Sequence, residues 1–323
     1  MDNLYMITNL IKLTLMRNHP KTFSFLLLLL LGFIWGTGYS IARFAMTHGV
    51  PPLGYGFWQS LGPAILLSLM VLRTPTRAAL AINISASRYY FFCALTGIVI
   101  PNTTMYFAAP HLPAGLLAVI VNTVPIMAYP IALMARVESF HWLRLMGVCC
   151  AVAGLMCLVL PNTSLPSPHM IPWVLTVLLT PLSFACCAIY ISRHQPQQSN
   201  PITLSTGTLL FSSILLLPIV LYSKSFYSLH LPLTLPDSVI LLEIVLSSLG
   251  YILFFQLIKV AGPVYYSLVD TIVSLTGLLW GYFLFHERLN QWTGTAVLLI
   301  LFSLVLITKY QSMASHKLEA ANV

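Results

Sequence analysis

The sequence predicts an all-α, polytopic membrane protein in which ten transmembrane helices form two inverted repeats of five helices. Three observations support this prediction. The chain of 323 residues is 58% hydrophobic and only 7% charged, whereas soluble domains carry roughly 25% charged residues. Its apolar stretches reach about 20 residues, the length of a helix that crosses a bilayer core. Landmark residues of the first half also recur in the second half at a constant offset.

The five spans of the first half are apolar stretches separated by turn-forming or charged residues. The first span follows Lys21 and is too long for the apolar region of a cleavable signal peptide, so we expect it to remain attached. The sequence HGVPP at 48–52 separates the first two spans, and Pro110 separates the third from the fourth. The predicted spans are residues 23–47, 51–73, 88–109, 113–136 and 141–161.

Similar turn signals divide the second half into five further spans. The breaks fall at the sequence QPQ at 195–197, between Pro232 and Pro236, and at the pair Gly262-Pro263. Ten crossings would place both ends of the chain on the same side of the membrane. The predicted spans are residues 170–193, 200–222, 238–259, 263–285 and 291–310.

The fifteen Lys and Arg residues lie singly between the apolar stretches. Cytoplasmic loops of membrane proteins carry an excess of these residues. With a cytoplasmic N-terminus, only Arg43, Lys224 and Arg288 lie outside, and the other twelve lie inside. This bias predicts that both termini are cytoplasmic, and it supports the count of ten spans. The scattered single charges form no basic stripe, so we expect no nucleic-acid partner.

Matching positions in the two halves are 149 residues apart. Glu138 directly follows the fourth span, and Glu287 directly follows the ninth. Because five crossings are an odd number, the second copy is inverted relative to the first, an arrangement that suits alternating access. We predict a first repeat at residues 1–161 and a second, inverted repeat at residues 162–323. Other matched positions are Trp35-Gly36 with Phe184-Ala185, Pro52 with Pro201, and Pro101 with Gly250.

Several short motifs occur in a fixed order along the chain. They are Trp35-Gly36, Pro51-Pro52, Pro125, Glu138, and the run Glu287-Arg288-Leu289 before Trp292 and Gly294. In their order and spacing, the chain resembles the drug/metabolite transporter superfamily, in particular its ten-helix EamA-type members. The resemblance implies a multi-pass protein of the bacterial inner (cytoplasmic) membrane that carries amino acids or related metabolites, most often outward. Members often place an arginine early in the second span, where this chain has Trp58-Gln59-Ser60, so a relative's substrate does not transfer directly.

Asp270 is the first candidate for a transport site. A charged side chain at membrane depth costs about 2.5–3.5 kcal/mol on insertion scales and by default indicates function. Asp270 is predicted about eight residues into the ninth span, which is about 12 Å deep at 1.5 Å per residue. It shares a helical face with Ser274, Gly277 and Gly281, and small residues allow close helix packing. We expect it to point into the bundle; the alternative is a structural aspartate that joins helices by hydrogen bonds.

Glu243 and Arg43 are predicted at similar depth near the outer side. Glu243 lies in the eighth span on a face with Ser247 and Gly250, and Arg43 lies in the last third of the first span. We expect these two side chains to pair, either as an outer gate or as an anchor for a charged substrate group. The alternatives are a static structural ion pair and an Arg43 that extends to the outer interface.

Neutral polar and aromatic residues near mid-depth are further candidates for the wall of a solute path. The sequence PNTT at 101–104 interrupts the third span and frees backbone groups, as in the broken helices that line transport sites. For any single aromatic side chain, packing against lipid or at the interface is the alternative. The candidates of this kind are Trp35, Tyr39, Asn102, Tyr106, Asn122, Tyr251 and Tyr266.

The absence of a nucleotide-binding P-loop from the sequence predicts a secondary transporter of a small-molecule substrate, without a cofactor. Asp270 and Glu243 are the only carboxylates inside the predicted spans. Proton coupling would therefore pass through one of them, and an uncoupled facilitator is the alternative. We expect a monomer in the lipid bilayer, because the glycine-containing faces would be used for packing within the chain.

Two other functions remain open at this point. An intramembrane enzyme would need a convergent catalytic group, but the motifs G-x-S-x-G and H-E-x-x-H are absent, so we identify no catalytic residue. The histidines lie at span ends or in loops without metal-ligand spacing, so we expect no metal site. An exchanger of nucleotide-linked or phosphorylated metabolites would need cations in its cavity, for which Arg43 is the only candidate.

Overall fold

The computed structural model describes residues 20–73, 84–136, 140–159, 168–195, 201–266, 269–288 and 290–321. Within these residues the regular structure is helical and no strand is present, which confirms the predicted fold class. By length and composition, six of the described helices could each cross a membrane, and three further apolar helices are shorter. The first half contains α2 (Pro20–Thr47), α3 (Pro52–Arg73), α4 (Ile84–Ala94), the π-helix η1 (Leu95–Val99), α5 (Ile100–Ala108), α6 (Ala114–Val121), α7 (Val124–Met134) and α8 (Trp142–Val159).

The second half has a similar order of helical segments over the part of the chain that the structure describes. Each of the ten predicted spans corresponds to one helix or to one broken helix. The elements are the 3₁₀ turn η2 (Pro168–Met170), α9 (Ile171–Val177), α10 (Leu179–His194), α11 (Pro201–Tyr222), α12 (Leu235–Tyr266), α13 (Val269–Phe285) and α14 (Gln291–Ala321).

Three of the predicted spans are broken shortly before a proline. The π-helix η1 precedes Pro101, the turn between α6 and α7 precedes Pro125, and a single non-helical residue between α9 and α10 precedes Pro181. Proline has no N–H for the carbonyl four residues earlier and its ring crowds that carbonyl, so the preceding turn must change its hydrogen bonding. The breaks therefore follow from the position of each proline.

The predicted boundary between the eighth and ninth spans is wrong. We expected Gly262-Pro263 to end the eighth span, but α12 continues through this pair to Tyr266, and α13 begins only at Val269. Glycine and proline are tolerated inside membrane helices because neighbouring groups satisfy the freed backbone atoms. Asp270 consequently lies in the first turn of α13 and not two turns inside it.

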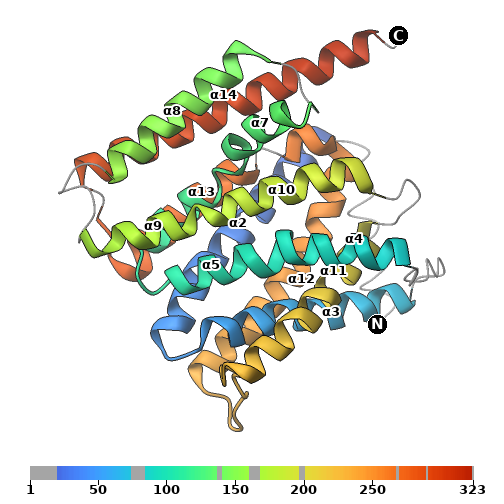
Figure 1. Ribbon diagram of the computed structural model, residues 1–323, viewed down its shortest axis with the longest axis vertical. Helices are drawn as coiled ribbons and strands as arrows, with labels where there is room; N and C mark the ends of the chain where they lie inside the picture. The colour runs from blue at the N-terminus through green and yellow to red at the C-terminus, as the bar shows by residue number, and fades with distance from the viewer. Residues whose placement is uncertain are drawn as a thin grey trace.

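The contacts between helices repeat when the two halves are exchanged. α2 packs against α12 and α13, and its counterpart α10 packs against α5 and α7, the counterparts of those two helices. α3 pairs with its own counterpart α11, and α8 pairs with α14. Figure 1 shows α8 and α14 side by side at one edge of the bundle. The arrangement of helices thus has the internal symmetry that the sequence repeat predicts.

The two halves run in opposite directions through the bundle. Arg43, near the end of α2, contacts Glu287 at the end of α13, and Glu287 also binds the beginning of α6. Arg193, near the end of α10, instead donates to the carbonyl of Ala135 just after α7. Because α6 and α7 run from the first location to the second, α2 and α10 end at opposite ends of the bundle. The second repeat is therefore inverted, as predicted.

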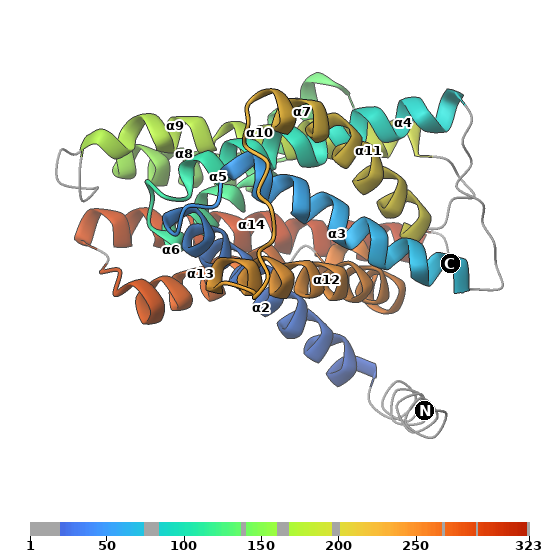
Figure 2. The same cartoon turned by 90° about the horizontal axis from the view of Figure 1, so that it is seen from below.

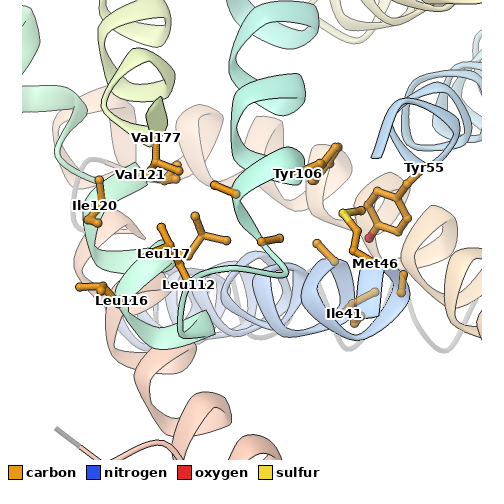
Figure 3. Close-up of a cluster of buried hydrophobic side chains, with 14 of the residues drawn as sticks. Ile41, Met46, Tyr55, Tyr106, Leu112, Leu116, Leu117, Ile120, Val121 and Val177 are labelled. Carbon is orange, nitrogen blue, oxygen red and sulfur yellow. The ribbon is translucent and has the colours of Figure 1, made fainter. Parts of the chain in front are cut away.

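A cluster of buried apolar side chains occupies the end of the bundle at which α2 terminates, which we call the Arg43 end. Leu112, Leu116 and Leu117 in this cluster are at most 1% exposed. Figure 3 shows Ile41 and Met46 on one side of it and the leucines of α6 on the other. Figure 2 shows the connection from α11 to α12 passing in front of α3, where Trp58 Nε1 donates to the Tyr227 carbonyl at 2.8 Å.

Candidate functional site

Glu243 is a buried carboxylate at the contact between α12 and α3. The residue is 6% exposed. Its Oε1 accepts hydrogen bonds from Gln59 Nε2 at 2.6 Å and from Ser247 Oγ at 3.0 Å. Ser247 lies one helical turn further along α12 and also contacts Gln59. The sequence placed Glu243 and Ser247 on one face, but it did not indicate that Gln59 of α3 would complete the group.

Two buried oxygens at this site have no hydrogen-bond partner among the described residues: Glu243 Oε2 and Tyr55 Oη. Tyr55 is 1% exposed and lies within electrostatic reach of Glu243. Buried polar groups without partners are rare in proteins, because they give up water without compensation. Both atoms therefore have capacity for a further partner.

Glycine at position 38 lets α2 approach the carboxylate. A Cβ at Gly38 would lie 3.2 Å from Glu243 Oε1, closer than most Cβ contacts. A larger residue here would push α2 away from α12 or displace the carboxylate from Gln59. The close approach brings the next residue of α2, Tyr39, toward the same region.

Four tyrosines surround this region. Tyr55 of α3 and Tyr106 of α5 meet edge to face, with ring centroids 4.8 Å apart. Tyr106 is also within electrostatic reach of Glu243, Tyr251 and Tyr39. Tyr55 and Tyr106 belong to the apolar cluster as well (Figure 3), so the polar group directly adjoins the apolar packing at the Arg43 end.

Asn122 and Asp270 extend the polar group along α2. Asn122 lies in the turn between α6 and α7, where its Nδ2 donates to the Ala118 carbonyl at 2.7 Å and to Tyr39 Oη at 3.3 Å. Asp270 of α13 is an electrostatic neighbour of the same tyrosine, without a hydrogen bond to it among the described residues. The turn before Pro125 thus presents the Asn122 amide to Tyr39 of α2.

These residues together form one group contributed by both halves, which we call the central polar cluster. Residues from α2, α3, α5, the α6–α7 turn, α12 and α13 contribute to it. Its members are Tyr39, Tyr55, Gln59, Tyr106, Asn122, Glu243, Ser247, Tyr251 and Asp270.

Asp270 is partly buried and lies level with the middle of α2, although it is near the beginning of its helix. Ile272, two residues further on, fills the space beside Gly32 in the middle of α2. Ser274 is fully buried and donates to the backbone carbonyl of Asp270 at 2.9 Å. On the same face, Gly277 packs against Ala118 of α6. Ser274 therefore belongs to helix packing, whereas the Asp270 carboxylate makes no hydrogen bond or ion pair within the described residues.

The predicted pair between Arg43 and Glu243 is wrong. Arg43 Nη1 forms an ion pair with Glu287 Oε1, and its guanidinium lies 4.5 Å from the centre of the Phe285 ring. Glu287 also accepts the backbone N–H groups of Ala114 at 2.6 Å and Gly115 at 3.1 Å. These N–H groups open α6 and have no partner inside that helix. The pair thus joins α2, α6 and α13 at the Arg43 end.

The remaining predicted site residues, Trp35, Asn102 and Tyr266, are not members of the central polar cluster. Trp35 packs against Tyr251 and Phe254, and its Nε1 lies over Gly250. Asn102 is partly buried and lies just after the break in the third span. Next to it, Thr180 Oγ1 of α10 donates a hydrogen bond to the Pro101 carbonyl at 3.1 Å. Tyr266 is within α12, but its side chain lies outside the described side chains.

A surface groove lies on the outside of the bundle, and Ile272 in its wall is two residues from Asp270. It lies between α2 and α13, and its wall is almost entirely apolar, including Leu26, Phe33 and Leu279. An apolar groove on the outside of the bundle matches the hydrocarbon of a bilayer and offers no polar recognition. The central polar cluster is therefore the better candidate for a functional site.

Comparison with known proteins agrees with the internal repeat. The EamA-like transporter family matches residues 22–160 and again residues 171–309. The "Uncharacterized transporter YvbV" of Bacillus subtilis (strain 168) is 22% identical over 292 residues, which cover 90% of this chain and 93% of that protein. A solved structure titled "Crystal structure of protein" covers 91% of this chain and 99% of its own, with a TM-score of 0.60 at 13% identity, and so shares the fold. The two matches cover most of the chain, which belongs to the EamA-like transporter family.

Proposed function

We propose that this chain is a secondary transporter that moves a small polar metabolite, most often outward, across the bacterial inner membrane by alternating access. An amino acid or a derivative of one is the favoured substrate. The observation that carries the proposal is the central polar cluster, because two carboxylates and their polar neighbours from both halves converge inside the bundle. Such groups are costly within a membrane unless they serve a passing solute or an ion.

The Arg43 end supports an alternating mechanism. Here the apolar cluster packs the end of the bundle, and the Arg43–Glu287 pair joins α2, α6 and α13, as a closed gate would require. The distribution of positive charge assigns this end to the outside. In the proposed cycle, the conformation of this structure is closed to the outside. In the other conformation, the corresponding helices of the second, inverted repeat would close the opposite end.

Three further parts of the proposal concern organisation and energy. We place the junction of the repeats between residues 161 and 162. We propose a monomer, because small residues such as Gly36, Gly154 and Gly277 face other helices of the same chain. A gradient of the solute or of protons would drive transport, and a coupled proton would bind Glu243 or Asp270.

The alternative function, exchange of nucleotide-linked or phosphorylated metabolites, has little support in the structure. A phosphate group needs cations at its binding site, and Arg43 is committed to Glu287. Among the described side chains, no Lys or Arg forms an ion pair with a carboxylate of the central polar cluster. An amino acid or a related polar solute fits this charge distribution better.

A comparison of solute flux tests the proposed function. Bacterial cells with and without the protein would be compared for release and uptake of amino acids and other polar metabolites by mass spectrometry. Solutes that differ would then be tested for counterflow in proteoliposomes. We expect a specific solute to leave expressing cells faster, and we expect Glu243→Gln to abolish the difference.

The exposed residue Arg288 provides the control, because Arg288→Gln also removes a charge but lies outside the cluster. This variant should transport like the unmodified protein. If no solute differed in either direction, and no counterflow occurred in proteoliposomes, the transport proposal would be overturned.

A further inference from the structure

We propose that Glu243 binds a cationic amino group of the solute, so that the transported compounds are amines and not anions. The inference rests on the proposed function, because it assigns a substrate class to the same site. It begins from Glu243 Oε2, a buried carboxylate oxygen without a partner among the described residues. An ammonium group supplies three N–H donors and a positive charge, and it would satisfy this oxygen and balance its charge.

The neighbours of the carboxylate leave its charge uncompensated. Gln59 and Ser247 donate to Oε1, but both side chains are neutral. Arg43, the positively charged side chain that we had expected here, binds Glu287 instead. A second carboxylate, Asp270, adds negative charge to the cluster and is likewise without an ion-pair partner in the described part of the chain. An anionic solute would be repelled by this arrangement.

The tyrosines add a second feature that suits an ammonium group. Tyr55 Oη is buried and unpartnered, and it can accept a second N–H of the same group. The faces of aromatic rings attract cations, and more strongly where water is excluded. Tyr55 lies one helical turn before Gln59, the partner of Glu243, and its ring meets Tyr106 edge to face at 4.8 Å. A carboxylate and aromatic rings together recognise positive charge on an organic body.

A charge series of small probes tests this inference. Tyramine and isobutylamine would be titrated onto the purified protein by calorimetry, next to their alcohol and carboxylate analogues, which keep the same organic body. We expect at least one amine to bind at least tenfold more tightly than its alcohol, and we expect the carboxylates to bind weakest. Glu243→Gln, which preserves the side-chain shape, should bring the amine to the affinity of its alcohol.

Two further variants separate charge recognition from folding. Glu243→Asp keeps the charge and should retain part of the preference for amines. Glu287→Gln removes a carboxylate at the Arg43 end and should leave the ratio of amine to alcohol affinity unchanged. Thermal unfolding of each variant would show whether the protein remains folded.

Several outcomes would overturn the inference: alcohols or carboxylates that bind as tightly as amines, no amine binding up to millimolar concentration, or an amine preference that survives in Glu243→Gln. A transported solute without a cationic group would also overturn it while leaving the transport proposal intact. Conversely, amine binding that depends on Glu243, without flux of any solute, would overturn the transport proposal alone.

Discussion

Single glycines on α2 determine how closely this helix meets its neighbours. Gly36 faces α13, where a Cβ would lie 2.5 Å from the Thr276 Cβ and 2.8 Å from the Val273 carbonyl oxygen. A backbone oxygen cannot rotate away, so the helices would have to separate. Overpacking of this kind typically costs about 1–3 kcal/mol. We expect Gly36→Ala to lower the unfolding free energy by about this amount, as measured in detergent micelles.

Gly294 in α14 provides a matched control, because a Cβ there would meet no atom within 4 Å. Alanine is favoured over glycine inside a helix by about 0.5–1 kcal/mol, so Gly294→Ala should be neutral or stabilising. Equal stabilities for Gly36→Ala and the unmodified protein would show that the close packing of α2 on α13 is incorrect.

At this scale the sequence predicted which residues are interior better than it predicted which residues pair. Helical periodicity correctly put Glu243 and Ser247 on one face, and it put Ser274 and Gly277 on another. It gave the wrong partner for Arg43, because depth along a span does not reveal how two helices are rotated toward each other. Glu287 is 244 residues from Arg43 in sequence, and only the packing of α2 against α13 brings them together.

At the scale of helices, the Arg43–Glu287 pair connects three elements, and a double-mutant cycle measures that connection. We expect Arg43→Ala and Glu287→Gln to be non-additive in unfolding free energy by about 0.5–3 kcal/mol, the range for residues in one network. The control cycle combines Arg43→Ala with Glu243→Gln, the pair that the structure rules out. These two changes should be additive. Additivity in the first cycle, or coupling in the second, would contradict the contacts described here.

The break in the third span makes a second prediction about helices. Ser183 Oγ of α10 donates to the Thr96 carbonyl at 2.7 Å, and Thr180 Oγ1 donates to the Pro101 carbonyl. Loss of either hydroxyl removes a hydrogen bond between α10 and the broken span, and hydrogen bonds between membrane helices average about 0.6 kcal/mol. We expect Ser183→Ala and Thr180→Val each to destabilise the protein by about 0.5–1.5 kcal/mol.

The control for this experiment is Thr176→Val on the neighbouring helix α9. Thr176 Oγ1 donates to the Pro172 carbonyl within its own helix, so its loss should change stability little. If Thr176→Val were as destabilising as Thr180→Val, then the contacts between α10 and the broken span would have no special role.

Prolines in the sequence were a reliable sign of a helix break at some positions and not at others. The sequence PNTT at 101–104 was expected to interrupt the third span, and the break lies directly before it. The break before Pro125 was not predicted. Gly262-Pro263 was expected to end a helix, but the helix continues. The local sequence is similar in kind at all these places. The outcome depends on whether neighbouring groups satisfy the freed carbonyls, and a single sequence does not reveal which helices will be adjacent.

At the scale of the whole molecule, the inverted repeat could be predicted from the sequence, because it follows from the number of spans in each copy. An odd number of spans per copy and a constant offset between matching glutamates are sufficient to predict opposite directions. The exchange of helix contacts between the halves and the two matches to the EamA-like family agree with that prediction. The end that we propose to be closed could not be predicted in this way, because the two conformations of an alternating-access cycle would contain the same spans.

Chemical labelling tests which end of the molecule is closed. Ser247→Cys places a thiol beside Glu243, in a background where the six native cysteines are replaced. A membrane-impermeant thiol reagent should reach it mainly from the side opposite the Arg43 end. Adding Glu287→Gln should raise labelling from the Arg43 end, about tenfold if the ion pair contributes about 1.4 kcal/mol to closure. Leu279→Cys, on the apolar outer surface, should resist the reagent from both sides, and equal labelling of Ser247→Cys from both sides would contradict closure at the Arg43 end.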